Sequence, residues 1–431
     1  MPFDPRASSI DADRLWTDLM ALAAITEPDR PWTRRSFTTR FDEGRTWLSN
    51  LFVDAGLSIR MDAGGNLIGR LDGRLSLPPI MLGSHSDTVP SGGRFDGAAG
   101  LVAALEVARA VIRSGQRLDH PLEIVDFLAE EPSDYGISCI GSRAMAGALS
   151  PETLSRTNKR GERLSEAIAR VGGVPSALER VVPPKISAYL ELHIEQGRVL
   201  ENAGIDLGIV TAIVGIARVE LILLGSADHA GGTPMNLRRD AGVAAAEIIS
   251  WAAEQGVLQA NSGRGHFVVT TGIIEISPNA ANVVPGQARL VLDIRAENSG
   301  QLDEFVLLLD RYSLDAASRI GVKRDRFAII SRTDPTPCDA HLRDVLTNSA
   351  AKLGYKTTEL ASGAGHDAAF VARIGRSAML FIPCLEGKSH SPDEWADPDA
   401  VAMGAATLYE AVRSLDIAGA TNKTILESAN Q

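Results

Sequence analysis

The sequence is poor in cysteine, has no long apolar run and carries no excess of basic residues. The three cysteines, Cys139, Cys338 and Cys384, are odd in number and far apart. They therefore predict no disulfide framework and suit a reducing compartment. No apolar run approaches the roughly 18 residues of a membrane span, and the first residues include acids and prolines where a signal peptide needs an apolar segment. A cytoplasmic protein is expected. Its net charge of −11 disfavours nucleic acid or an anionic membrane as the main partner.

A chain of 431 residues is too long for one ordinary core, so two domains are expected. Helix-like and strand-like segments alternate in the first half, which is typical of an α/β fold with a largely parallel sheet. The pattern predicts helices at 11–24, 41–55 and 97–114, and strands at 57–61, 66–70, 79–83, 122–129 and 188–193. Near the end of the chain, it predicts a helix, a strand and a helix at 339–353, 377–382 and 397–414.

A different pattern separates these two parts of the chain. It predicts strands at 216–224, 267–277, 288–296 and 326–332 and helices at 236–254 and 301–320. The resulting order, βαββαβ, is that of the ferredoxin-like split unit. We therefore expect an α+β domain, residues 214–331, inserted into an α/β domain that is formed by residues 1–213 and 332–431.

The segment GSHSDTVPSGGRFDGAAG (83–100) gathers polar side chains at the end of a short apolar run. Ligands of open α/β sheets bind at this carboxyl edge. His85 and Asp87 are two positions apart and face the same way on a strand, so one can bind a metal ion while the other orients it. A satisfied core histidine and a capping acid are the alternatives. Asp96 can also serve as the N-cap of the following helix, with or without a bound cation.

Glu130 and Glu131 end the next apolar strand. Two adjacent buried carboxylates repel each other unless a cation or a proton compensates. Because neighbours on a strand point to opposite sides, one would bind metal, and the other would hold a water and shuttle its proton. Solvated loop acids are the alternative.

His193 and His390 lie in comparable surroundings, in LELHIEQG and GKSHSPDE. Neither is specific by itself. Taken with the earlier residues, three histidines, one aspartate and one glutamate at strand ends suit two divalent ions that share a carboxylate. Two such ions activate a water and polarise a carbonyl oxygen, so the pattern predicts a metallohydrolase.

Several motifs resemble those of one family. They are ELHIEQG (191–197), HAGGTPM (229–235), PNAANVVPG (278–286), DIR (293–295) and SGAGHDA (362–368). They are similar to motifs of the hydantoinase/carbamoylase branch of the M20 clan, a group of amidohydrolases with two metal ions. The branch includes N-carbamoyl-L-amino-acid hydrolases, β-ureidopropionases, and allantoate and ureidoglycolate amidohydrolases. The resemblance extends over nearly the whole chain.

The resemblance implies a metal-binding catalytic domain and an inserted lid and dimerisation domain. It also implies two divalent ions per subunit, Zn or else Mn, Co or Ni, and a homodimer. The metal ligands that it implies are His85, Asp96, Glu131, His193 and His390, with Asp96 bridging the two ions.

The remaining motif residues receive catalytic or substrate-binding roles from the same resemblance. Glu130 would be the general acid/base, Asp87 would orient His85, and His229 would bind a substrate oxygen and stabilise the oxyanion in the partner subunit's site. The residues implied to bind the substrate carboxylate are Gln196, Asn282, Arg295, Gly363 and Gly365. For Arg295 the chemistry agrees, since a guanidinium binds a carboxylate in a bidentate manner and a strand-end arginine needs an anion. A surface salt bridge is the alternative.

One segment departs from the family pattern. Gly-Ser-Arg-Phe commonly follows the paired glutamates, whereas this chain has Pro132-Ser133-Asp134-Tyr135-Gly136. An aspartate in place of the arginine reverses a charge near the expected metal ligands. It leaves those ligands unchanged and leaves the substrate subclass open; selection against a second carboxylate is one interpretation.

These observations predict hydrolysis of a linear C–N bond in an N-carbamoyl or ureido carboxylate, with release of ammonia. The first alternative is an aminoacylase or dipeptidase-like M20 enzyme. The HIEQG and DIR motifs argue against this alternative. The second alternative is a non-catalytic protein that binds a metal or a metabolite. The presence of every expected type of metal ligand argues against it.

Overall fold

The structure, a computed structural model, describes residues 9–180 and 182–428. The chain forms two compact units. Unit 1 comprises Met1–Thr211, Cys338–Leu360 and His366–Gln431, and unit 2 comprises Ala212–Pro337 and Ala361–Gly365. The ends of the predicted outer domain, residues 1–8 and 429–431, lie outside the described residues. Within the described ranges, none of the helices combines the length and the apolar character that crossing a membrane requires.

The larger sheet is mixed and has nine strands, in the order β1-β2-β4-β3-β5-β13-β6-β11, with β12 paired to β6. All of them except β11 lie wholly or mostly in unit 1. The four central strands, β4, β3, β5 and β13, run parallel, and the pairs toward the edges are antiparallel. The predicted fold class, α/β with a mixed and largely parallel sheet, is confirmed. The strands are β1 (Ser58–Met61), β2 (Leu67–Leu71), β3 (Ile80–His85), β4 (Leu122–Phe127), β5 (Ala188–Ile194), β6 (Leu207–Ile213), β11 (Thr336–Pro337), β12 (Thr357–Ser362) and β13 (Ser377–Ile382).

Four helices of unit 1, α1, α2, α5 and α10, begin at a residue whose side chain caps the first turn. The Asp11 side chain accepts a hydrogen bond from the main-chain N–H of Arg14 at the start of α1, as an N-cap does. The Ala-rich α3 is buried along almost its whole length, as expected of a helix that packs on a sheet. The helices are α1 (Ala12–Ala24), α2 (Thr39–Asp54), α3 (Ala98–Arg113), α4 (Ile140–Met145), α5 (Pro151–Leu154), α6 (Leu164–Arg170), α7 (Val199–Ala203), α10 (Ala340–Lys352), α11 (Ala368–Val371) and α12 (Pro398–Ser428).

Several elements differ from the sequence-based expectation, among them β4 and β6. Strand β4 ends at Phe127, before the expected residue 129, because the backbone turns at Ala129 with φ +52°. Strand β6 was not predicted. Its apolar residues continue almost without interruption into the next strand, so the boundary at Val214 gives no signal in the sequence.

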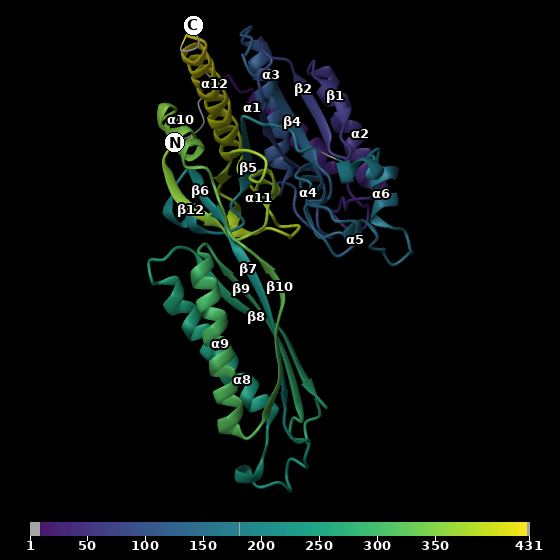
Figure 1. The fold of residues 1–431 in the computed structure, drawn as a ribbon, viewed down its shortest axis with the longest axis vertical. Helices are drawn as coiled ribbons and strands as arrows, with labels where there is room; N and C mark the ends of the chain where they lie inside the picture. The colour runs from purple at the N-terminus through teal and green to yellow at the C-terminus, as the bar shows by residue number, and fades with distance from the viewer. Residues whose placement is uncertain (1–8, 181, 429–431) are drawn as a thin grey trace. The chain divides into compact units, whose positions relative to one another are not determined.

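Unit 2 has the order β7 (Gly215–Leu224), α8 (Ala241–Ala260), β8 (Phe267–Ser277), β9 (Gln287–Ala296), α9 (Ser299–Ile320) and β10 (Lys323–Thr333). Its antiparallel sheet has the strand order β10-β7-β9-β8, which is that of a ferredoxin-like split unit. Figure 1 shows α8 and α9 together along the same face of this sheet. Alternate residues of the strands, such as Val219 and Leu292, form the core beneath the two helices.

The loop 361–365 also belongs to unit 2, whereas the expected boundaries include it in the outer domain. Main-chain and side-chain hydrogen bonds explain this: Val214 N–H donates to the Ser362 carbonyl at 3.0 Å, and Arg295 Nη1 donates to the Gly363 carbonyl at 2.7 Å.

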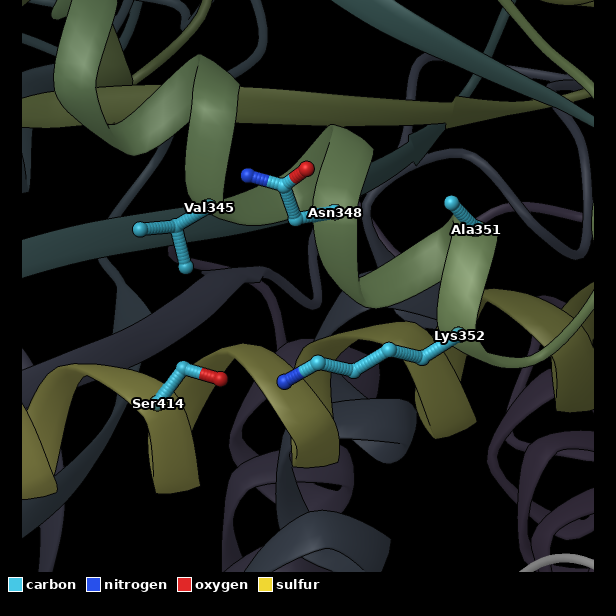
Figure 2. A pocket seen from close by; sticks show the side chains of 5 residues that line it. All are labelled: Val345, Asn348, Ala351, Lys352 and Ser414. Carbon is cyan, nitrogen blue, oxygen red and sulfur yellow. The ribbon is translucent and has the colours of Figure 1, made fainter.

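A hollow of about 610 Å³ lies in unit 1 against α10 and α12. Figure 2 shows the residues that line it, which are Val345, Asn348, Ala351, Lys352 and Ser414. They include neither an acid nor a histidine, so this hollow does not have the chemistry that the motifs predict.

Candidate metal centre

The parallel strands of unit 1 bring the predicted ligands to one edge of the sheet. His85 is the last residue of β3, and His193 is the last but one of β5. Glu130 and Glu131 follow β4, and His390 follows β13. Since β4, β3, β5 and β13 are neighbours in the sheet, their carboxyl ends meet at the same edge.

The imidazoles of His85 and His193 are held by main-chain carbonyls. Nδ1 of His85 lies 3.0 Å from the Asp87 carbonyl, and Nδ1 of His193 lies 2.9 Å from the Ile194 carbonyl. A carbonyl only accepts, so Nδ1 carries the proton in both rings and Nε2 presents its lone pair. The His85 Nε2 is buried without a hydrogen-bond partner, which excludes the alternative of a satisfied core histidine.

Asp96 lies between two sets of imidazoles. Its Oδ1 is 3.1 Å from His193 Nε2 and 3.5 Å from His85 Nε2, whereas its Oδ2 is 3.2 Å from His390 Nε2. Asp96 does not cap α3: the N-cap is Gly97, and no side chain accepts a hydrogen bond there. Each oxygen of this carboxylate therefore faces a different group of candidate ligands.

Glu130 and Glu131 are buried, with exposures of 7% and 5%, so they are not solvated loop acids. Glu131 Oε1 lies 3.2 Å from His390 Nε2, and Glu130 Oε2 lies 3.6 Å from His85 Nε2. The two carboxylates thus face different histidines. They lie in the loop beyond β4 and not on the strand itself, so it is the turn at Ala129 that separates them.

Asp87 supports this loop more directly than it supports His85. Its carboxylate accepts hydrogen bonds from the main-chain N–H groups of Glu130 at 3.2 Å and Glu131 at 3.3 Å. The same carboxylate is 3.5 Å from His85 Nδ1, which is farther than the Asp87 carbonyl. One residue therefore positions both the imidazole and the adjacent glutamates.

Burial and mutual charge shift the pKa values of these groups strongly. Burial alone lowers the pKa of His85, but Glu130, Asp87 and Asp96 raise it well above its usual value. Hydrogen bonds with Asp96 and Glu131 raise the pKa of His390 to about 10. Burial, together with nearby carboxylates, raises the pKa of Glu130 well above its usual value despite the opposing effect of His85. Excess negative charge here favours any bound cation, whether a proton or a metal ion.

The donor set fits divalent ions. Lone pairs of imidazole nitrogens and carboxylate oxygens face each other and repel unless a cation lies between them. Nitrogen and oxygen ligands at 2.0–2.2 Å around a tetrahedral ion are about 3.3–3.6 Å from each other. The imidazole–carboxylate separations around Asp96 and Glu131 are 3.1–3.5 Å. Two groups, His85–Asp96–His193 and Asp96–Glu131–His390, could each hold an ion, and they share Asp96.

Sequence reasoning assigned no role to Glu191 and His366. With His193 they form a third group of clustered donors, and the His366 ring lies edge-on to His193 with centroids 4.6 Å apart. Both Glu191 oxygens accept hydrogen bonds, from Ser84 Oγ at 2.9 Å and from Tyr189 Oη at 3.0 Å. Alternation on β5 offered a signal, since residues 191 and 193 lie on the same side of the strand.

Gln196, predicted to bind substrate, lies beside the candidate metal ligands in unit 1. Its Nε2 donates to Asp96 Oδ2 at 2.8 Å, and its backbone has φ +55°. The side chain therefore orients the Asp96 carboxylate.

The divergent loop residue Asp134 forms an ion pair with Arg35, so the negative charge of Asp134 is compensated within the chain.

The other predicted substrate-binding residues lie in unit 2. His229 is exposed, and its Nδ1 accepts hydrogen bonds from the main-chain N–H groups of Gly231 at 3.2 Å and Gly232 at 2.9 Å. This leaves the proton on Nε2, as a donor to an oxyanion requires. Asn282 is exposed and joins this loop through its carbonyl, which accepts from Ala230 N–H at 3.0 Å.

Arg295 needs no external anion, contrary to the expectation. Its Nε donates to Asp293 Oδ1 at 2.6 Å and its Nη1 to the Gly363 carbonyl. The expectation was wrong because the pairing partner lies two residues away on the same face of β9. Gly363 thus lies beside the arginine, and Gly365 is exposed two residues farther along.

Comparison with known proteins places this arrangement in a family. The model of peptidase family M20/M25/M40 matches residues 81–414. The chain belongs to this family. It is 37% identical to the N-carbamoyl-L-amino acid amidohydrolase of Geobacillus stearothermophilus over 94% of this chain and 99% of that protein. It is 35% identical to the ureidoglycolate hydrolase of Arabidopsis thaliana over 95% of this chain and 87% of that one.

Solved structures agree with this assignment. A hydantoinase/carbamoylase family amidase from Burkholderia multivorans superposes with a TM-score of 0.89 at 32% identity, covering 95% of this chain and 99% of that chain. The resemblance to the hydantoinase/carbamoylase branch of the M20 family is therefore confirmed. So is the predicted enzyme class, an amidohydrolase of C–N bonds other than peptide bonds.

Proposed function

We propose that this M20 amidohydrolase cleaves a linear C–N bond in an N-carbamoyl or ureido carboxylate and releases ammonia, using two divalent ions. The observation that carries the proposal is the position of Asp96, whose two oxygens face different sets of candidate ligands. We propose His85 and His193 for one ion, Glu131 and His390 for the other, and Asp96 for both. Such ions, when bound, lower the pKa of a water and polarise a carbonyl oxygen.

Glu130 is proposed as the general acid/base. It is buried beside the two groups of candidate ligands, where a carboxylate can accept and return a proton. It would take a proton from the attacking water and deliver it to the leaving nitrogen. Asp87 fixes the main chain of Glu130 through a hydrogen bond and so keeps this carboxylate in place.

The oxyanion and the substrate carboxylate are assigned to residues of unit 2. His229 would donate its Nε2 proton to the oxyanion in the partner subunit's site, because the two glycine N–H groups hold its Nδ1 as an acceptor. Arg295 and Asn282, with the backbone at Gly363 and Gly365, would bind the carboxylate. In this proposal unit 2 is the lid and dimerisation domain of a homodimer, which a molar-mass measurement in solution tests.

The relatives named as an N-carbamoyl-L-amino acid amidohydrolase and a ureidoglycolate hydrolase support a ureido substrate. The deciding experiment is an ammonia-release screen of protein reconstituted with Zn, Mn, Co or Ni. Its substrates are N-carbamoyl amino acids, N-carbamoyl-β-alanine, allantoate and ureidoglycolate. We expect turnover of at least one of them, lost on chelation and restored by metal. Turnover of N-acetyl amino acids or dipeptides alone would contradict the proposal.

A further inference from the structure

The predicted carboxylate-binding arginine is already neutralised. Arg295 Nε lies 2.6 Å from Asp293 Oδ1, so this pair carries no net charge. Its Nη1 is also engaged, by the Gly363 carbonyl. A neutral pair attracts a substrate carboxylate weakly, because the approaching anion meets Asp293 as well as the guanidinium.

A second arginine restores the positive charge. Arg218 on β7 lies directly opposite Asp293 on β9 in the sheet register, and its Nε is 3.0 Å from Asp293 Oδ2. Asp293 therefore binds both guanidiniums: Arg295 at Oδ1 and, at 3.5 Å, at Oδ2, and Arg218 at Oδ2. Within the described part of the chain, only the Nε of Arg218 forms a hydrogen bond, and its side chain is 47% exposed, so its Nη groups remain available to an anion.

The two arginines share the face of the sheet that the helices leave uncovered. Residues alternate between the faces of a strand, and the neighbours of Arg218, Ala217 and Val219, lie in the core beneath α8 and α9 (Figure 1). Asp293 and Arg295 are two apart on β9, so they lie on the same open face as Arg218.

A second arginine group on these strands shows the contrast. Arg289 is paired with Glu220 and Glu275, and Arg326 is also paired with Glu220. That group has two arginines and two glutamates, whereas the first has two arginines and one aspartate. Of the two ion-paired groups, the one beside Gly363 therefore carries a net positive charge.

We propose that Arg218 is a specificity-determining residue that binds the substrate carboxylate together with Arg295, the two guanidiniums being held in register by Asp293. This inference rests on the proposed function and deepens it: the substrate end remote from the reacting bond is an anion, and one carboxylate balances the charge of the group. Nothing in the motifs marks Arg218, because its partner is set by the pairing of β7 with β9.

The test measures binding without turnover. Calorimetric titrations use the Glu130→Gln protein, reconstituted with Mn²⁺, and compare N-carbamoyl-L-alanine, allantoate and ureidoglycolate with the carboxamide of N-carbamoyl-L-alanine. Adding Arg218→Gln should weaken binding of the carboxylates about tenfold, the effect of one charge-assisted hydrogen bond near the surface. It should change carboxamide binding less than about twofold. Arg289→Gln is the matched control and should change neither.

Two further variants separate charge from a structural role. Arg218→Lys keeps the charge and should retain most of the affinity. Adding Asp293→Asn to Arg218→Gln removes the compensating carboxylate, so Arg295 gains a net charge and carboxylate binding should recover several-fold. Equal weakening of carboxylate and carboxamide, or no recovery in the double variant, would overturn the proposal.

Binding and ammonia release, measured together, distinguish failure of the proposed function from failure of the proposed arginine pair. Suppose that carboxylate binding depends on Arg218 but that the metal-loaded protein with Glu130 intact releases no ammonia. This result would refute the proposed function and leave the proposed arginine pair standing. Ammonia release with an unchanged KM in Arg218→Gln would refute the arginine pair and leave the function standing. Absence of binding for all three carboxylates would overturn the pair as well.

Discussion

The candidate metal ligands of unit 1 and the arginine pair of unit 2 hold charged side chains in opposite ways. At the strand ends of unit 1, Asp96 is 4% exposed and His85 is 1% exposed. Carboxylates are in excess there, and main-chain hydrogen bonds fix both the imidazoles and the glutamate loop. On the open sheet of unit 2, Arg218 is half exposed, and cationic charge is in excess. One carboxylate holds both guanidiniums, and the Gly363 carbonyl adds a hydrogen bond to Arg295.

The difference predicts how each region tolerates change. A charge removed from a buried group leaves its partners uncompensated in a medium of low dielectric, which costs several kcal/mol. A charge removed from an exposed pair costs about 0–1 kcal/mol, because water replaces the partner. Chemistry should therefore depend on unit 1 in an all-or-none manner, whereas substrate selection can be adjusted gradually in unit 2.

The largest effect is expected from Asp96→Asn. Each oxygen of Asp96 faces a different ligand group, so the substitution removes a charged ligand from both. We expect loss of bound metal after dialysis and a fall in kcat/KM of at least about a thousandfold, well beyond the 10–100-fold typical of residues that only support ligands. Metal analysis and ammonia release are the measurements, with the exposed Asp54→Asn as the control. Full metal content in Asp96→Asn would contradict the shared carboxylate.

Substitutions of the two adjacent glutamates should have different effects on metal content and turnover. Glu130→Gln should keep its metal and lose about 10²–10⁴-fold in kcat, the range for a general acid/base. Glu131→Gln should lose metal, because Glu131 contacts His390 and belongs to the second ligand group. Metal content and turnover are measured on both proteins. An active Glu130→Gln enzyme with normal metal content would remove Glu130 from its assigned role.

A smaller effect is expected where only the support of a ligand changes. Gly97 has φ +65°, and a Cβ added there would overlap the His85 imidazole. Gly97→Ala should therefore lower metal affinity about 10–100-fold, measured by competition with a chelator. Gly115→Ala has the same backbone cost, at φ +68°, but its Cβ would meet open space. Similar metal affinities in the two variants would show that His85 is not held in this way.

In the metal-free protein, stability should fall as the pH rises. The raised pKa values of His85, His193 and His390 give stability that is complete below the unfolded-state value of about 6.5. This stability is lost as the pH passes through the folded-state values, about 10 for His390. The raised pKa of Glu130 acts in the same direction, because burial favours its neutral form.

Thermal unfolding of chelated protein between pH 6.5 and about 9.5 tests this linkage. The midpoint should decrease across the range and should decrease less in metal-loaded protein, where the ions replace the protons. The lowered pKa of Asp96 adds no slope here, since its contribution is lost only at acid pH. A thermal midpoint that rises with pH in the chelated protein would contradict the raised pKa values of the three histidines and Glu130.

The two regions also differ in how far the sequence predicts them. Strand ends, spacing and apolar runs indicate the positions of His85 and Glu131, because each needs only its own strand and the rule that ligands collect at the carboxyl edge. The same reasoning missed Glu191, although it shares a side of β5 with His193, and it missed His366, which lies in a loop beyond β12. It also misjudged Arg295 and overlooked Arg218. The pairing of Arg218 with Asp293 depends on the register of β7 against β9, which is non-local and leaves no local pattern.

The smallest effect should come from unit 2. Arg218→Gln removes an ion pair whose arginine is 47% exposed, so the free energy of unfolding should change by about 0–1 kcal/mol. The thermal midpoint should hardly move, although carboxylate binding weakens about tenfold. Thermal unfolding monitored by circular dichroism, with Arg289→Gln as the reference, measures this. A large loss of stability in Arg218→Gln alone would mean that the arginine holds the sheet together, and the contrast between a fixed metal-ligand group and an adjustable binding face would no longer stand.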